Sequence, residues 1–207
     1  GDNMVLHENR LSKNLGTPPG TLVSTIKNGA VASTEIDIFD YDENTLNTPP
    51  QTDALSECIK SKNTKTVTWI NVNSVHDIDL IRKIGEIYDI HPLVLEDITD
   101  TTQRPKMEEY DGYIYVVMKM LTFDANSCEV ISEQVSMVFG SSWVITFQEN
   151  KGDVFDGIRH RIKNHTGRIR RMGADYLAYS LIDAIVDQYF TILENVGACI
   201  EELEESS

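Results

Sequence analysis

Short runs rich in β-branched and aromatic residues recur along the chain and predict strands. One of them, Thr66–Val72, is expected to be buried because nearly all of its residues are apolar or β-branched. Turn residues at 124–127 and 140–142 separate the last three runs, which indicates an antiparallel meander. The predicted strands cover residues 21–26, 35–41, 66–72, 107–122, 129–139 and 143–148.

Other segments repeat apolar residues at the three- and four-residue spacing that is typical of a helix. One is His76–Tyr88, and Asn73 or Ser74 is expected to cap it. Pro92 suits the first position of a second, short helix. Asp153 is expected to cap a third. The predicted helices cover residues 53–59, 76–88, 91–98, 154–162 and 174–205.

The segment 174–205 predicts one long helix with an apolar stripe from Leu177 to Leu203. At ~1.5 Å per residue such a helix is ~48 Å long. A domain of this size is roughly 35–40 Å across. We therefore expect the helix to extend beyond the domain. Because the pattern is still helical near Ser207, we also expect the chain to be a fragment of a longer protein.

Strand–helix–strand units followed by hairpins predict an α/β domain with a mixed sheet. Residues 1–20 are polar, end in a Pro-Pro-Gly turn and are expected to form a flexible N-terminal arm. The domain is expected at 21–172, and the long helical region at 173–207.

The charge of the chain is strongly acidic and unevenly distributed. It has 33 Asp and Glu against 18 Lys and Arg, a net charge of −15. This balance argues against nucleic acid or an anionic lipid surface as a partner and favours cations or basic partners. Residues 157–171 carry six Lys or Arg, which are expected to pair with acids of this chain or of a neighbouring subunit. No segment has the ~20 mostly apolar residues of a membrane-spanning helix.

The three cysteines, Cys58, Cys128 and Cys199, are scattered, and no CxxC pair occurs. This pattern suggests neither a zinc site nor a disulfide framework. We expect all three to be reduced thiols in a cytosolic protein.

Two acidic pairs are candidate metal ligands. Asp183 and Asp187 are four residues apart on the long helix, with no Lys or Arg nearby in sequence. Their repulsion costs only ~0.2–0.5 kcal/mol on an exposed helix, so two solvated carboxylates are one interpretation. A divalent cation held by oxygen ligands is the other.

The second pair is Glu96 and Asp97, near the C-terminus of the short helix at 91–98. Carboxylates are disfavoured there by the helix dipole, so a positively charged neighbour is expected. Arg104 or Lys106 would supply that charge in a purely structural role. A magnesium ion would need only one or two of the carboxylates, because it retains much of its water shell.

No enzyme is predicted from the sequence. It lacks a phosphate-binding glycine loop, a GxSxG nucleophile turn and an HExxH zinc motif. The histidines have no partners at catalytic spacing, so no nucleophile is paired with a base.

From residue 91 onward the sequence resembles the cytoplasmic domain of CorA magnesium transporters. The likeness lies in the segment HPLVLEDITDTTQRPKMEEYDGYIYVVMKM (91–120) and in EQVSMVFG (133–140), VITFQE (144–149), GDVFDGIRHRI (152–162) and GRIRRMGADYLAYSLIDAIVDQYF (167–190). PPGTLV (18–23) and TWINV (68–72) also fit the family.

The resemblance implies a cytoplasmic α/β/α sandwich with a mixed parallel and antiparallel sheet, followed by a long helix. It implies a homopentamer in the inner membrane, held there by C-terminal helices absent from this chain. The family's Gly-Met-Asn pore motif is also absent, so this fragment is not expected to transport ions.

The resemblance further implies a regulatory Mg²⁺ site between subunits, which Co²⁺ or Ca²⁺ could also occupy. Its positions match Glu96, Asp97 and Asp183, and Asp187 is a further candidate. Bound ions would favour the closed state of the channel.

Two alternatives remain open at this stage. A transporter of zinc or another divalent cation in the same superfamily would share this domain, although the scarcity of His and Cys favours a hard ion. A stand-alone soluble sensor or interaction domain would use the acids for solubility alone.

Overall fold

The computed structural model describes residues 34–205. The predicted N-terminal arm and the strand predicted at 21–26 lie outside this range.

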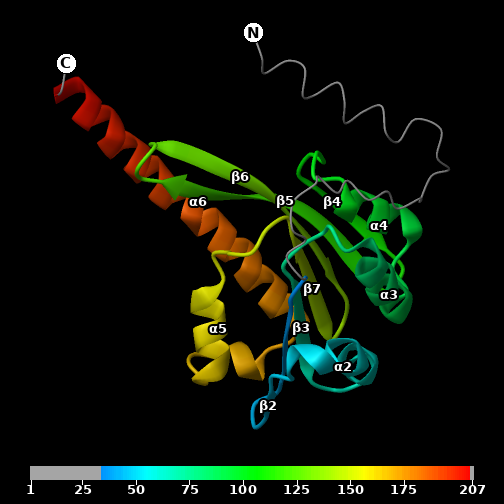
Figure 1. Cartoon of the computed structure of the whole chain (residues 1–207). Coiled ribbons are helices and arrows are strands. Elements are labelled where there is room, and N and C mark those ends of the chain that lie inside the picture. The colour runs from blue at the N-terminus through cyan, green and yellow to red at the C-terminus, as the bar shows by residue number, and fades with distance from the viewer. Residues whose placement is uncertain (1–33, 206–207) are drawn as a thin grey trace, which may run out of the picture.

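The described residues contain a seven-stranded sheet in the order β2-β1-β3-β7-β6-β5-β4 (Figure 1). β3 and β7 are parallel, and every other neighbouring pair is antiparallel. The predicted mixed sheet is therefore confirmed. The strands are β1 (Ile36–Tyr41), β2 (Leu46–Asn47), β3 (Val67–Val72), β4 (Lys106–Tyr110), β5 (Tyr113–Asp124), β6 (Glu129–Phe139) and β7 (Trp143–Gln148).

Helices cover both faces of the sheet and make three layers. On one face lie α2 (Ala54–Ser61), α3 (Ile78–Tyr88) and α4 (Pro92–Thr99), and on the other α5 (Asp156–Lys163) and α6 (Ala174–Glu205) (Figure 1). Short 3₁₀ turns, η1 (Gln51–Asp53) and η2 (Ile169–Arg171), precede α2 and α6. The α/β/α sandwich with a long C-terminal helix is thus confirmed.

The alternation of side chains along the strands builds two separate cores. On β3, Ile70 faces the α2–α4 layer, while the neighbouring Trp69 faces α5 and α6. A buried polar network lies between β3 and β7: the Trp69 indole N–H donates to Thr146 Oγ1 at 3.0 Å, and the Thr146 hydroxyl donates to Asn71 Oδ1 at 2.6 Å. These bonds satisfy polar groups that water cannot reach.

Two local predictions are wrong. The single strand predicted at 107–122 is two strands, because Asp111 and Gly112 form a tight turn in which Gly112 has a φ of +85°. Glycine adopts such a conformation without strain. Neither Asn73 nor Ser74 caps α3; the Asp77 carboxylate does so, accepting from the Leu80 amide at 3.0 Å.

The N-terminus of α4 follows the prediction, and that of α5 differs in detail. Pro92 occupies the first turn of α4, and His91 Nδ1 accepts from the Leu93 amide at 3.1 Å. Asp153 lies three residues before α5 and accepts from the amide of Phe155, which is the N-cap residue.

The long helix extends beyond the sheet, as the sequence predicts. Its last buried residue is Ile192; the turns after it run along the β5–β6 hairpin, and the end of the helix passes the tip of that hairpin (Figure 1). The Tyr189 hydroxyl donates to the Lys119 carbonyl, which joins helix and hairpin. Within residues 34–205 no helix is both long and apolar enough to cross a membrane.

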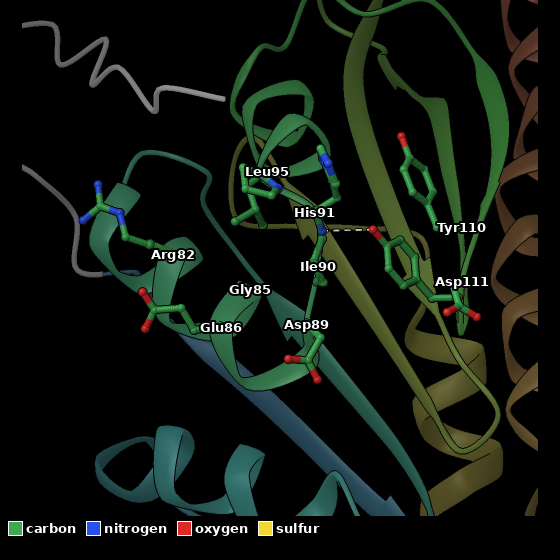
Figure 2. A pocket seen from close by; sticks show the side chains of 11 residues that line it. Arg82, Gly85, Glu86, Asp89, Ile90, His91, Leu95, Tyr110 and Asp111 are labelled. Atoms are coloured by element: carbon green, nitrogen blue, oxygen red, sulfur yellow. Dashed lines mark hydrogen bonds between the residues drawn. The ribbon is translucent and has the colours of Figure 1, made fainter. Parts of the chain in front are cut away.

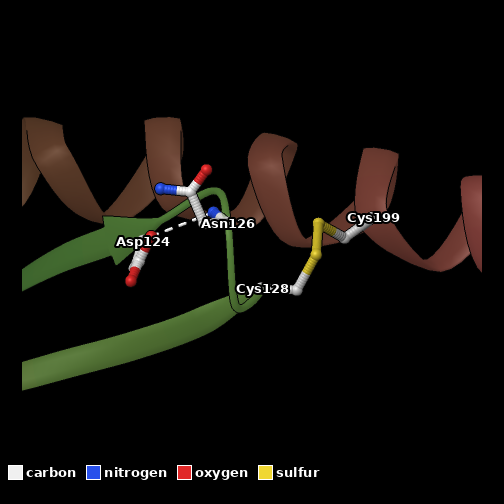
Figure 3. The surroundings of a disulfide bond; sticks show 4 residues. All are labelled: Asp124, Asn126, Cys128 and Cys199. Carbon is white, nitrogen blue, oxygen red and sulfur yellow. Dashed lines mark hydrogen bonds between the residues drawn. A yellow bond between two sulfur atoms is a disulfide. The ribbon is translucent and has the colours of Figure 1, made fainter.

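The expectation of three reduced thiols is wrong for two of them. Cys128, in the β5–β6 turn, is disulfide-bonded to Cys199 on α6, 71 residues away (Figure 3). The sequence could not indicate this pair, because it depends on the hairpin lying along the helix. Cys58 is a free, buried thiol, as expected.

Candidate metal site

The first acidic pair lies at the end of α4, where a lysine already holds one of its members. The Lys106 ammonium donates to Asp97 Oδ2 at 2.6 Å and to Glu108 Oε1 at 3.1 Å. The Asp97 and Lys106 side chains are each 28% exposed. The structural role suggested for Lys106 from the sequence is therefore present in the folded chain, and Arg104 is exposed.

Hydrogen bonds favour the charged forms of Lys106 and Glu108. Burial alone lowers the pKa of Lys106, but the hydrogen bonds that it donates to Asp97 and Glu108 outweigh this effect and raise that pKa above its ordinary value. The same contact with Lys106 lowers the pKa of Glu108. Lys106 therefore stays protonated at neutral pH, and any cation that binds Asp97 competes with this ammonium group.

Glu96 lies beside Asp97 in the last turn of α4 and is partly buried. Its carbonyl accepts from the Thr99 hydroxyl and the Asp100 amide, which closes the helix. The Asp100 carboxylate is used in the turn that follows, accepting from Thr102 and Gln103. Glu96 and Asp97 are the carboxylates of this helix end that the sequence predicts as metal ligands.

The second acidic pair lies on the other side of the molecule. Asp183 and Asp187 are exposed on α6 and line a cleft of about 310 Å³ between α5 and α6. Arg161 and Ser180 line the same cleft. A cation that entered this cleft from one chain alone would meet the Arg161 guanidinium, so the cleft by itself is a poor metal site.

The basic run at 157–171 pairs in part with acids of its own chain, as predicted. Arg159 donates to both oxygens of Asp153, at 2.6 and 2.5 Å, and to Asp156 at 3.0 Å. Arg170 is buried, and its Nε donates to the Asp42 carbonyl at 2.9 Å.

The two acidic pairs are not brought together within one chain. Glu96 and Asp97 belong to the layer of α4, whereas Asp183 and Asp187 belong to α6 on the opposite face of the sheet. In the described part of the chain no group of three or more His, Cys, Asp or Glu is placed to hold a metal ion. An ion that used both pairs would therefore have to bind between two chains.

A larger cleft that the sequence did not indicate lies between α3, the start of α4 and the β4–β5 turn. It has a volume of about 820 Å³, and Figure 2 shows the side chains that line it. Its wall includes the stacked rings of Tyr110 and Tyr113, 5.1 Å apart, and the Tyr113 hydroxyl accepts from the His91 amide at 3.0 Å. Charged residues of both signs, Arg82, Glu86, Asp89 and Asp111, surround it.

With the geometry established, comparison with known proteins identifies the family. Residues 64–207 match the sequence model of the family of CorA-like Mg²⁺ transporter proteins. The chain belongs to this family. It is also 45% identical over 200 residues to the cobalt/magnesium transport protein CorA of Thermotoga maritima. That match covers 97% of this chain and 56% of the Thermotoga protein, so the chain spans just over half the length of this CorA relative.

Solved structures agree with the CorA fold. The soluble domain of CorA from Methanocaldococcus jannaschii has a TM-score of 0.58 at 15% identity, covering 89% of this chain and 66% of that one. The ZntB cytoplasmic domain from Vibrio parahaemolyticus has a TM-score of 0.55 at 13% identity, covering 78% and 62%. At such low identity these two structures speak for the fold alone. The homologues are transporters rather than enzymes.

Proposed function

We propose that this chain is the cytoplasmic, Mg²⁺-sensing domain of a CorA-type divalent-cation transporter. The observation that carries the proposal is the 45% identity to a cobalt/magnesium transport protein over nearly the whole chain. In the proposed assembly, ions bind between the subunits of a homopentamer and favour the closed channel. Co²⁺ or Ca²⁺ could replace Mg²⁺, because each accepts oxygen ligands.

The placement of the acids supports a site shared between subunits. Asp97 and Asp183 lie on opposite faces of one sheet, so they can share an ion only when two chains meet. In the proposed site Asp97 of one subunit and Asp183 of the next contribute oxygen ligands, with Glu96 and Asp187 beside them. Carboxylates suit Mg²⁺ better than zinc, which prefers nitrogen and sulfur ligands.

The net charge explains how ion binding would act on the channel. Each chain carries −15, so neighbouring subunits repel one another. A divalent ion between them replaces repulsion by attraction and stabilises the closed arrangement. By linkage, the ion shifts this equilibrium only by the difference between its affinities for the two states. Loss of ions at low internal Mg²⁺ then favours opening.

Lys106 sets the concentration range of this response. Because Lys106 is paired with Asp97 at 2.6 Å, Mg²⁺ must displace an ammonium group before it can bind there. The competition weakens the site, which suits a sensor that must release its ion when the concentration falls.

The proposal is tested by Mg²⁺ inhibition of transport in the full-length protein. We expect Asp97→Asn to raise the Mg²⁺ concentration for half-inhibition by about tenfold or more, equivalent to at least ~1.4 kcal/mol. The matched control is Asp79→Asn, which removes one charge from α3 on the same face of the sheet. Asp79 is 79% exposed and paired with Arg82 at 2.8 Å, so its loss should change inhibition little. Equal inhibition of wild type and Asp97→Asn would exclude this role for Asp97.

A further inference from the structure

The β5–β6 hairpin is covalently tied to the long helix at a point remote from both acidic pairs. Cys128 lies in the hairpin turn with a φ of +54°, and Cys199 lies near the C-terminal end of α6 (Figure 3). The two Cα atoms are 6.3 Å apart. The disulfide therefore joins two elements that are 71 residues apart along the sequence.

The outer part of this hairpin has few other supports. β4 pairs with β5 as far as Val117, and β7 pairs with β6 from Val135 onward. Closer to the turn, residues 121–124 of β5 pair with residues 129–132 of β6, and in the described sheet neither segment has a second neighbouring strand. A two-stranded ribbon is marginally stable by itself. A hydrogen bond from Tyr189 to the Lys119 carbonyl also connects the hairpin to α6.

Solvent reaches the disulfide but not the third cysteine. Cys128 is exposed and Cys199 is partly exposed. Cys58 is fully buried, and burial raises the pKa of its thiol to about 12. Thiol–disulfide exchange requires a thiolate and access to the sulfur that it attacks. Redox chemistry with solvent reagents is therefore confined to the Cys128–Cys199 pair.

The charges around the disulfide select which reductants approach it. From Met120 to Asn150 the chain has four acids and no Lys or Arg, and after Arg171 it has eight acids and no Lys or Arg. Both segments that carry the disulfide are thus acidic. An anionic thiol is repelled from such a surface, while a reductant with positive charge is attracted.

We propose that Cys128 and Cys199 form a reversible thiol–disulfide exchange site whose partner is a dithiol with a positively charged surface. The partner's thiolate attacks the sulfur of Cys128, the more exposed residue of the pair, the S–S bond breaks, and Cys199 leaves as a thiolate that takes up a proton. The partner's second thiol then attacks the mixed disulfide and releases Cys128. The dithiol loses two electrons and two protons and becomes a disulfide, and the cysteine pair becomes two thiols.

Reduction detaches the ribbon from α6. Beyond Ile192 the helix has no buried residue within the described chain, and the ribbon residues Val130 and Ile131 are 44% and 45% exposed. No buried side chain of the distal helix therefore replaces the covalent link once it is broken. The reduced protein has a more mobile hairpin tip and distal helix, while the rest of the sheet is unchanged.

The chemical half of the proposal is tested by measuring reduction rates with small thiols of opposite charge. The rate at which each thiol, cationic cysteamine or anionic thioglycolate, reduces the Cys128–Cys199 disulfide is divided by the rate at which the same thiol reduces a neutral model disulfide. This ratio removes differences in the intrinsic reactivity of the two thiols. We expect cysteamine to be favoured by at least about threefold at low salt, and the preference to disappear at ~0.5 M KCl. The variant Cys58→Ala should give the same rates, with one free thiol fewer per chain both before and after reduction. Equal corrected rates would overturn the charge selection.

The structural half is tested by hydrogen exchange of the 207-residue chain, oxidised and reduced. We expect amides in 121–132 and 193–205 to exchange on the order of tenfold faster after reduction, and β3 and β7 to be unaffected. Cys199→Ser, which cannot form the bond, should match the reduced protein under both conditions. Unchanged exchange in both segments, or three free thiols after exposure to an oxidised dithiol, would overturn the proposal.

Discussion

Lys106 competes with any cation for Asp97 in the proposed site. Its ammonium group contacts both Asp97 and Glu108 and lies 5.5 Å from the centre of the Tyr115 ring. The pairing of Asp97 with a nearby base was one of two interpretations of the sequence, and the structure contains it. The sequence could not show that Lys106 rather than Arg104 makes the contact, because that depends on the direction in which β4 leaves the turn after α4.

Removal of this competitor should tighten the proposed Mg²⁺ response. We expect Lys106→Met in the full-length transporter to lower the Mg²⁺ concentration for half-inhibition by several-fold. Mg²⁺ then has no ammonium group to displace from Asp97. Lys60→Met is the matched control, since Lys60 pairs with Glu57 at 2.5 Å on α2, away from α4. A higher half-inhibiting concentration in Lys106→Met would contradict competition at Asp97.

The buried thiol of Cys58 predicts a pH dependence of stability. Burial raises its pKa from about 9 to about 12, so the folded chain keeps a proton that the unfolded chain loses. The stabilisation is complete below the unfolded pKa and is lost as the pH rises from 9 towards 12. By pH 10.5 this one group should remove about 2 kcal/mol from the free energy of unfolding.

Urea unfolding at pH 8 and pH 10.5 checks this prediction. Tyr41, Tyr88 and Tyr115 also have raised pKa values through burial, so both proteins should lose stability at high pH. Between pH 8 and pH 10.5 the free energy of unfolding of Cys58→Ala should fall by about 2 kcal/mol less than that of wild type. An equal loss in the two proteins would show that the thiol does not titrate in this way.

At the scale of elements, periodicity predicted most of the fold. β6 and β7 begin and end where the sequence indicates, because turn residues separate them from their neighbours, and α6 begins where its apolar periodicity starts. The prediction of one strand at 107–122 is wrong at Asp111–Gly112. The segments on both sides of this turn have the residue pattern of a strand, so the turn between them was not recognised. The cap of α3 was misplaced because Asn73 is buried and its side-chain oxygen accepts from Asn71.

The position of α4 depends on close packing against α3. A Cβ atom at Gly85 would lie 2.5 Å from Leu95 Cδ1 and 2.8 Å from its Cδ2, and Leu95 is buried. Gly85→Ala should therefore destabilise the protein by about 1–3 kcal/mol despite the better helix propensity of alanine. Gly157→Ala in α5 is the control, because its Cβ would meet nothing within 4 Å. The free energy of unfolding is measured with urea. Equal values for Gly85→Ala and Gly157→Ala would contradict the close packing of α4 against Gly85.

At the scale of the whole molecule, the sheet separates the candidate ligands. The family resemblance predicted Glu96, Asp97 and Asp183 as ligands, and helical spacing added Asp187, but neither could show where a single chain places them. The structure sets α4 and α6 on opposite faces. The disulfide was missed for a related reason, since a contact between segments 71 residues apart leaves no local signal.

The central claim is that one ion joins Asp97 of one subunit to Asp183 of the next. Mixing two defective subunits in one full-length transporter tests it most directly. A subunit with Asp183→Asn still offers Asp97, and a neighbour with Asp97→Asn still offers Asp183, so some interfaces of a mixed ring regain both acids.

The measurement is the Mg²⁺ concentration for half-inhibition of transport by each variant alone and by the co-assembled mixture. The account predicts that each variant alone resists inhibition, while the mixture recovers inhibition towards the wild-type range. A mixture that behaves as the average of the two variants would contradict an ion bound between subunits.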